Sequence, residues 1–269
     1  MVRKIYRQTL TFSLLCATLE VDVRMEILFP SNQQTTAEVI LMWNNKMKAF
    51  TLSYDDGISQ DIRFVELLNR YGLKCTFNLN SGIQTGASTW IGQNNTRITR
   101  MNMSGLRELY AGHEIAVHTL THPDLTKLDA ETVTNELTVD KTNLETFFGT
   151  KVTGMAYPYG THNEEVRALV KKAGLHYART VHSTNAFDLP ADLLQLPATC
   201  HHRAENLMEL AKQFAELKTD TPQLFYVWGH SYEFDVDNNW DRMEEFFKYI
   251  SGREDIFYGT NYEVLSSLF

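Results

Sequence analysis

From Met47 onward, short apolar runs typical of β-strands alternate with segments that have the apolar spacing of α-helices. The first pair is the run KAFTLSY, which ends at Asp55, followed by residues 61–71, whose apolar positions recur at helical spacing. Each helix has to return the chain before the next strand begins, which predicts parallel strands joined by right-handed crossovers. This alternation restricts the fold to an α/β sheet, either open or closed into a barrel.

The same unit recurs along the rest of the chain. Further strands are expected at 74–80, 113–119, 152–158, 176–181, 193–198, 224–230 and 256–260, and further helices at 104–111, 130–148, 164–173, 204–217 and 240–250. A long polar loop is expected after the second strand, through Asn95. About seven or eight such units without a glycine-rich dinucleotide fingerprint favour a barrel over an open sheet.

Residues 1–46 have no clear periodicity, so they are predicted to be a poorly defined N-terminal extension of one barrel domain at 47–269. The apolar run near the start is broken by Thr and Ser, and acidic residues follow it without a small-residue cleavage site. A cytoplasmic protein is therefore expected, and a secreted or periplasmic one if this segment is a degenerate signal. The widely spaced Cys16, Cys75 and Cys200 are expected to be reduced.

The net charge of -8 argues against electrostatic binding to nucleic acid or anionic lipid, since the protein's average field would repel both. No segment approaches the roughly 20 apolar residues that a membrane-spanning helix needs. A neutral or basic substrate fits this charge better. The oligomeric state is not predicted.

Polar side chains with catalytic potential follow three of the expected strands: Asp55 and Asp56, then His118 and His122, and finally His230. Alone, Asp-Asp-Gly is a common turn sequence and His-x-x-x-His could be a hydrogen-bonded loop. Together, two imidazoles and one carboxylate form a common facial ligand set that leaves positions open for water and substrate. Adjacent carboxylates at a strand end point in different directions, so one is expected to bind the metal and the other to act as a base.

Four segments resemble motifs of the polysaccharide deacetylases, carbohydrate esterase family 4. SYDDG is similar to the first motif, HTLTH at 118–122 to the second, AYPYG at 156–160 to a variant of the third, and WGH at 228–230 to the fifth. The resemblance spans residues 47–262. It implies a distorted (β/α) barrel with fewer than eight regular strands, about seven, and the removal of acetyl groups from N-acetylated carbohydrates.

Carried over by position, the resemblance implies that Asp55 is the catalytic base and His230 the general acid. It implies that Asp56, His118 and His122 bind one divalent cation. This donor set suits zinc, with cobalt, nickel and manganese as alternatives.

The third and fifth motifs supply further candidates. The resemblance implies that the backbone N–H of Tyr159 stabilises the oxyanion, although the aromatic residues of this motif could instead only line the barrel mouth. Trp228 falls where the family has an apolar residue that lines the acetyl pocket. His230 needs a carboxylate partner to be protonated, and Glu233 or Asp235 could supply it.

The chain departs from the family at Ala156, where the third motif usually begins with an arginine that steadies the base. Arg179 is the predicted replacement, because a nearby guanidinium would keep Asp55 ionised, but it could equally form an ordinary ion pair. The fourth motif is not recognisable. His201, His202 and the other histidines outside the motifs are interpreted as structural or exposed.

Three functions therefore remain open: an N-deacetylase of amino sugars, a hydrolase of another non-peptide C–N bond such as a cyclic ureide or of O-acetyl esters, and an inactive carbohydrate-binding relative. The intact ligand set and His230 argue against the inactive relative.

Overall fold

The structure, a computed structural model, describes residues 9–10, 25–26 and 43–269. Most of the expected N-terminal extension, with Cys16 and the segment on which the localisation depends, lies outside the described residues. Within it, β1 (Thr9–Leu10) and β2 (Met25–Glu26) pair antiparallel. No helix in the described part of the chain is long and apolar enough to cross a membrane.

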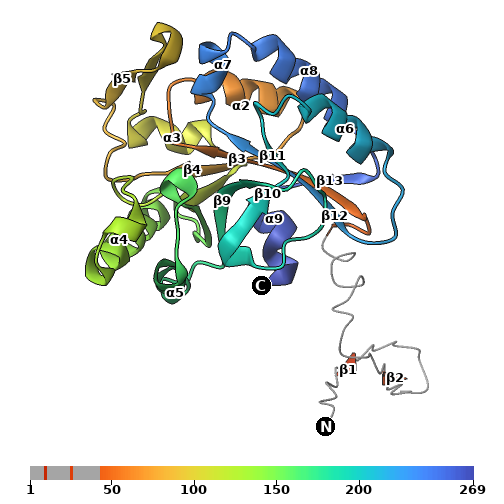
Figure 1. The fold of residues 1–269 in the computed structure, drawn as a ribbon, viewed down its shortest axis with the longest axis horizontal. Helices are drawn as coiled ribbons and strands as arrows, with labels where there is room; N and C mark the ends of the chain where they lie inside the picture. The colour runs from red at the N-terminus through yellow and green to blue at the C-terminus, as the bar shows by residue number, and fades with distance from the viewer. Residues whose placement is uncertain (1–8, 11–24, 27–42) are drawn as a thin grey trace, which may run out of the picture.

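A nine-stranded sheet forms the centre of the molecule, and all its ladders are parallel (Figure 1). Its strands are β3 (Lys48–Asp55), β4 (Thr76–Leu79), β7 (Glu114–Val117), β8 (Gly154–Ala156), β9 (Tyr177–Ser183), β10 (Leu196–Ala198), β11 (Cys200–His201), β12 (Gln223–Gly229) and β13 (Ile256–Tyr258). All eight residues of β3 are buried, as expected for a strand covered on both faces.

The segment from Leu196 to His201 closes this sheet into a barrel. Its first half, β10, pairs with β9, and its second half, β11, pairs with β12. The other strands already connect β9 to β12 through β8, β7, β4 and β3. The predicted α/β fold with a distorted parallel barrel is confirmed. The sheet has more strands than predicted because this one segment is divided between two neighbours.

The helices surround the sheet (Figure 1). They are α2 (Asp61–Arg70), α3 (Met103–Leu109), α4 (Ala130–Phe148), α5 (Glu164–Lys172), α6 (Leu207–Glu216), α7 (Tyr232–Val236), α8 (Trp240–Ile250) and α9 (Asn261–Leu265). The bounds of α4 and α8 agree with the prediction. In α4 they are defined chemically: the side chain of Asp129 accepts a hydrogen bond from the N–H of Thr132, and Gly149 ends the helix in the left-handed conformation.

The structure contains regular elements that the sequence analysis missed. The expected polar loop after β4 holds an antiparallel hairpin of β5 (Thr89–Ile91) and β6 (Arg97–Thr99). The short helices α7 and α9 were also not predicted. Elements of three to five residues are too short for a period of 2 or 3.6 to be recognised.

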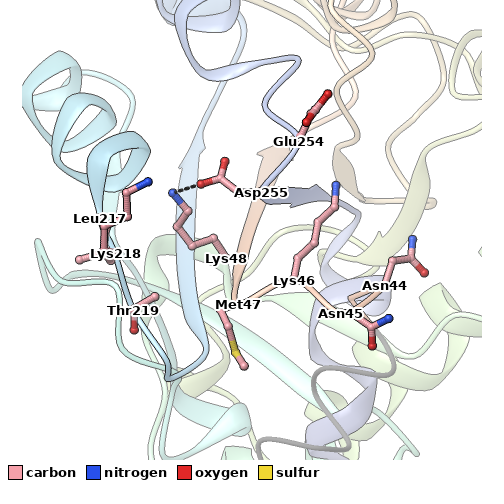
Figure 2. A pocket seen from close by; sticks show the side chains of 10 residues that line it. All are labelled: Asn44, Asn45, Lys46, Met47, Lys48, Leu217, Lys218, Thr219, Glu254 and Asp255. Carbon is pink, nitrogen blue, oxygen red and sulfur yellow. Dashed lines mark ion pairs between the residues drawn. The ribbon is translucent and has the colours of Figure 1, made fainter.

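A hollow of about 570 Å³ lies where the chain enters β3, and Figure 2 shows the side chains that line it. The buried Lys48 beside it forms an ion pair of 2.8 Å with Asp255 and donates to the carbonyl oxygens of Phe214 and Ala215. Parallel strands place their carboxyl ends at the opposite end of the barrel, where side chains usually carry out the chemistry. The hollow is therefore remote from the strand-end carboxylates, and Lys48 stabilises this end of the fold.

We expect Gly154→Ala in β8 to destabilise the protein by about 1–3 kcal/mol, the usual cost of overpacking. A Cβ there would lie 1.8 Å from the ring of Tyr177, which is buried and whose hydroxyl donates to Glu114. Gly105→Ala is the control, because Gly105 lies in α3 with space around it and the change should stabilise by about 0.5–1 kcal/mol. Chemical denaturation measures both, and equal effects would contradict the packing of Tyr177 against Gly154.

Candidate active site

The five polar residues predicted at strand ends lie together at the carboxyl end of the barrel. Asp55 is the last residue of β3 and Asp56 follows it, while His118 and His230 come directly after β7 and β12. The Nε2 atoms of His118 and His230 lie 3.9 and 3.8 Å from Asp55 Oδ2, and His122 Nε2 lies 3.9 Å from Asp56 Oδ1.

Asp56, His118 and His122 are arranged as a ligand set for a cation, with donor atoms that all lie within 4.8 Å of one another. The Nδ1 atom of His118 lies 2.8 Å from the carbonyl oxygen of Ala156, so its N–H donates there and Nε2 keeps its lone pair. Burial lowers the pKa of His118 to about 4, which favours the neutral imidazole that a metal requires. The residues present therefore fit a divalent cation.

Asp55 forms a buried ion pair with Arg179. The Nη2 atom of Arg179 lies 2.5 Å from each carboxylate oxygen, and Asn78 donates to Oδ1 at 2.8 Å. Burial alone would raise the pKa of Asp55, but Arg179 with His118 and His230 lowers it to about 2. The structure thus brings Arg179 to the carboxylate that the absent third-motif arginine would have contacted. Its role in catalysis stays a prediction.

The indole ring of Trp228 packs against the guanidinium group of Arg179, whose central carbon lies 4.4 Å from the ring centroid. Its ring is also in edge contact with His201. Trp228 is buried, and its described ring contacts are with Arg179, His201 and His230. Its predicted contact with an acetyl group stays a prediction.

Arg100 is a site residue that the sequence analysis missed. It follows β6, is almost fully buried, and donates to Asp56 Oδ1 at 2.5 Å. Burial would raise the pKa of Asp56, but His230, Arg100 and the two other histidines lower it. Each of the two adjacent carboxylates therefore has its own arginine. No motif marks Arg100, which reaches Asp56 because the end of the unpredicted hairpin pairs with the loop that follows Asp56.

His230 lies between Asp55 and Glu233. Its Nδ1 atom is 3.3 Å from Glu233 Oε2, to which its backbone N–H also donates at 3.1 Å. Burial would lower the pKa of His230, but the hydrogen bond to Glu233 and the charges of Asp55 and Asp56 raise it to about 9. Of the two carboxylates considered, Glu233 is the partner. Asp235 instead accepts from Trp240 and Gln60.

Glu233 also contacts His201, His202 and Arg203, with nitrogen-to-oxygen distances of 3.2, 3.4 and 3.1 Å. The sequence analysis assigned His201 no site context, but the structure brings it to the partner of His230. The donor atoms of His201, His230 and Glu233 also lie within 4.8 Å of one another. Burial would raise the pKa of Glu233, but hydrogen bonds from His201 and His230 keep it far below its usual range.

Backbone strain is concentrated around the candidate site. Apart from asparagines, the non-glycine residues with positive φ in the described chain are Asp56, Thr119, His122 and Tyr159, with φ between 58 and 83°. Such conformations each cost about 1–3 kcal/mol and persist where the surroundings enforce them. Tyr159 is the third residue of a turn closed by the bond from the Gly160 N–H to the Tyr157 carbonyl, with φ 58° and ψ 2°.

Helix α4 supports the strained histidine loop with two buried carboxyl groups one turn apart. Glu136 accepts from the backbone and hydroxyl of Thr121, at 2.8 and 2.7 Å. Asp140 accepts from the backbone N–H groups of Ser81 and His118. These bonds fix the orientation of the loop that carries the two imidazoles.

The comparisons with known proteins agree with this architecture. The family model for polysaccharide deacetylases matches residues 44–178, and the chain belongs to this family. A chitin deacetylase from Pestalotiopsis sp is 35% identical over 129 residues, which cover 48% of this chain and 39% of that protein. The chain spans less than half the length of the curated relatives that it matches.

Solved structures support the fold. The Xyl-CE4 domain of a multidomain xylanase from the hindgut metagenome of Trinervitermes trinervoides is 19% identical, with a TM-score of 0.50 over 82% of this chain and 91% of that one. A family 4 carbohydrate esterase from Streptomyces lividans is 17% identical, with a TM-score of 0.50 over 80% of this chain and 93% of that one.

The donor set generates a metal-binding prediction. Purified protein should bind about one divalent cation per chain, and His118→Ala should lose it because one of three donors is removed. Asp55→Asn should keep it, since Arg179 and Asn78 hold that side chain. Elemental analysis after dialysis measures both, with His176→Ala as an exposed histidine control. Full retention in His118→Ala would contradict the assigned site.

Proposed function

We propose that the protein is a metal-dependent hydrolase that removes N-acetyl groups from amino-sugar oligosaccharides or polysaccharides. One observation carries the proposal. At the barrel mouth, an ionised carboxylate lies within 4 Å of both a member of the cation-binding donor set and a protonated imidazole: Asp55 Oδ2 is 3.9 Å from His118 Nε2 and 3.8 Å from His230 Nε2. Membership of the polysaccharide deacetylase family supports this reading.

Asp56, His118 and His122 would hold the cation. When bound, a divalent cation of this kind polarises a carbonyl group and lowers the pKa of water. Arg100 holds Asp56 by one oxygen, which fixes the direction of the carboxylate. The hydrogen bond from His118 to Ala156 fixes the imidazole ring.

Asp55 would accept the proton of the attacking water. Its ion pair with Arg179 keeps it ionised over the whole neutral range, so the group is always in the form that can accept a proton. The bond from Asn78 limits the rotation of the carboxylate. The base is therefore positioned before substrate arrives.

His230 would donate a proton to the departing nitrogen, because an amine anion is a very poor leaving group. Its pKa of about 9, caused by Glu233, makes the imidazole cationic at neutral pH. The 3.8 Å between His230 Nε2 and Asp55 Oδ2 lets the acid and the base act on neighbouring atoms of one reacting group. The backbone N–H of Tyr159, aimed by a strained turn, would stabilise the oxyanion.

The experiment that tests this function is acetate release from chitooligosaccharides, peptidoglycan and acetylxylan by metal-loaded protein, with ring opening of allantoin assayed in parallel. Release from N-acetylated sugars supports the proposal. Activity confined to acetylxylan or allantoin would replace it with the esterase or ureide reading, and no activity on any substrate would favour an inactive relative.

Arg179→Met should lower turnover and shift the acid limb of the pH profile to higher pH. The depressed pKa of Asp55 rises when its positive neighbour is lost, so the carboxylate becomes ionised only at a higher pH. Arg179→Lys retains the charge and should lie closer to the parent. The profile of kcat/KM measures the limb, and thermal unfolding is followed because Arg179 is buried. An unchanged limb in a folded Met variant would contradict the role.

His230→Ala should reduce hydrolysis of an N-acetyl sugar by about 100-fold to 10,000-fold but reduce hydrolysis of an aryl acetate much less. An aryloxide leaves without protonation, whereas an amine does not. Metal content should be retained, and His176→Ala at the exposed amino end of β9 should leave both rates unchanged. Equal losses on the two substrates would refute the general-acid role, and loss of metal would make His230 a ligand.

A further inference from the structure

A buried carboxyl group that the proposed mechanism does not use joins three segments near the candidate site. It belongs to Asp61, the first residue of α2, which is fully buried. Its Oδ2 atom accepts from the backbone N–H of Ile58 at 3.1 Å and from the hydroxyl of Tyr110 at 2.6 Å. Its Oδ1 atom accepts from the hydroxyl of Ser231 at 2.6 Å. Both carboxyl oxygens are therefore held by hydrogen-bond donors.

Two of these donors adjoin residues of the candidate site. Ile58 lies two residues after Asp56, and the fully buried Ser231 directly follows His230. The backbone pairing of β12 with β3 ends one residue before His230, so the ladder does not fix the chain beyond that point. The side chain of Asp61 therefore connects the loop that leaves one strand to the segment that leaves the other.

The third donor comes from a different part of the molecule. Tyr110 directly follows α3, and its buried ring stacks on that of Phe77 in β4 with 4.0 Å between the ring centroids. It adjoins no residue of the candidate site in the sequence. Asp61 thus has two hydroxyl donors at the same distance, of which only Ser231 leads to the predicted acid.

The carboxyl group of Asp61 has no charged partner among its three donors. Burial raises its pKa to about 7, although the hydrogen bonds from Ser231, Tyr110 and Ile58 act in the opposite direction. The ionised form is therefore disfavoured by the fold. A buried acid that is retained at such a cost is typical of groups that serve a functional site.

We propose that Asp61 is a positioning residue, which holds the general acid His230 in reach of the leaving nitrogen through its bond to Ser231. This inference rests on the proposed function. A general acid has to lie within hydrogen-bond reach of the atom that it protonates, and a displacement of about 1 Å can cost about 100-fold in rate. Glu233 orients the imidazole ring through Nδ1, whereas the bond to Ser231 fixes the backbone that carries the ring.

The test compares Ser231→Ala with Tyr110→Phe, since each removes one hydroxyl donor from Asp61. Thermal unfolding should show similar destabilisation. The ratio of kcat/KM for an N-acetyl sugar to that for an aryl acetate should fall about 10-fold to 100-fold in Ser231→Ala, because only the amide needs the acid. It should stay unchanged in Tyr110→Phe, and both variants should retain the metal. Equal changes of the ratio in the two variants would overturn the proposal, as would an unchanged ratio in Ser231→Ala.

Asp61→Asn tests whether the effect passes through the carboxyl group. An amide keeps one oxygen for Ile58 and Tyr110 but presents an NH2 group to the hydroxyl of Ser231, which can no longer donate there. The substitution should lower the same ratio. Adding Ser231→Ala should lower it no further, because both changes break one bond. Losses that multiply in the double variant would show that the two residues act separately, which contradicts the proposal.

NMR titration of the His230 imidazole in zinc-loaded protein, assigned with His230→Ala, separates this inference from the proposed function. Burial would lower the pKa of His230, but the hydrogen bond to Glu233 and the charge of Asp55 raise it to about 9. A ring that moves away from Asp55 should titrate at lower pH, which is expected in Ser231→Ala and not in Tyr110→Phe.

The two readouts give distinct outcomes. A lowered pKa of His230 in Ser231→Ala alone, without acetate release by the parent, would refute the function and retain the positioning role. Acetate release by the parent, with the same pKa of His230 in both variants, would retain the function and refute the positioning role.

Discussion

The buried ion pair between Asp55 and Arg179 is the interaction on which the candidate site depends. The two residues come from β3 and β9, which are not neighbours in the sheet, so the pair crosses the interior of the barrel. Removing one partner of such a pair leaves an uncompensated buried charge and costs about 3–5 kcal/mol. The stability of the barrel and the ionisation of the candidate base are therefore coupled through one contact.

The loops that carry the other site residues are strained, and buried polar groups hold them in place. Thr119 and His122 have left-handed backbones although neither is glycine or asparagine. Asn80 donates to the carbonyl oxygens of His118 and Thr119, while Glu136 accepts from Thr121. Helix α4 and Asn80, which directly follows β4, thus hold this loop from both sides.

Strand ends were the part of this molecule that the sequence predicted best. Alternating strands and helices define a parallel barrel, and a parallel barrel brings strand-end residues such as Asp55, His118 and His230 to one face. The expectation that Arg179 lies near Asp55 came from its position in a strand after the third motif. The catalytic roles of these residues are still predictions.

Other site residues could not be predicted, because their contacts depend on how distant segments close over each other. Arg100 reaches Asp56 through a hairpin whose strands have only three residues each. His201 reaches Glu233 because a short strand joins β12. Neither residue has a local pattern that distinguishes it from an ordinary surface arginine or histidine.

The strand segment that closes the barrel has a consequence for how this chain tolerates change. Leu196–Ala198 pairs with β9, which carries Arg179, and Cys200–His201 pairs with β12, which leads to His230. One stretch of backbone thus pairs both with the strand that carries Arg179, the partner of Asp55, and with the strand that leads to His230. An insertion or deletion between Leu196 and His201 would move Arg179 and His230 relative to each other. This segment should therefore tolerate changes in length far less than the surrounding loops do.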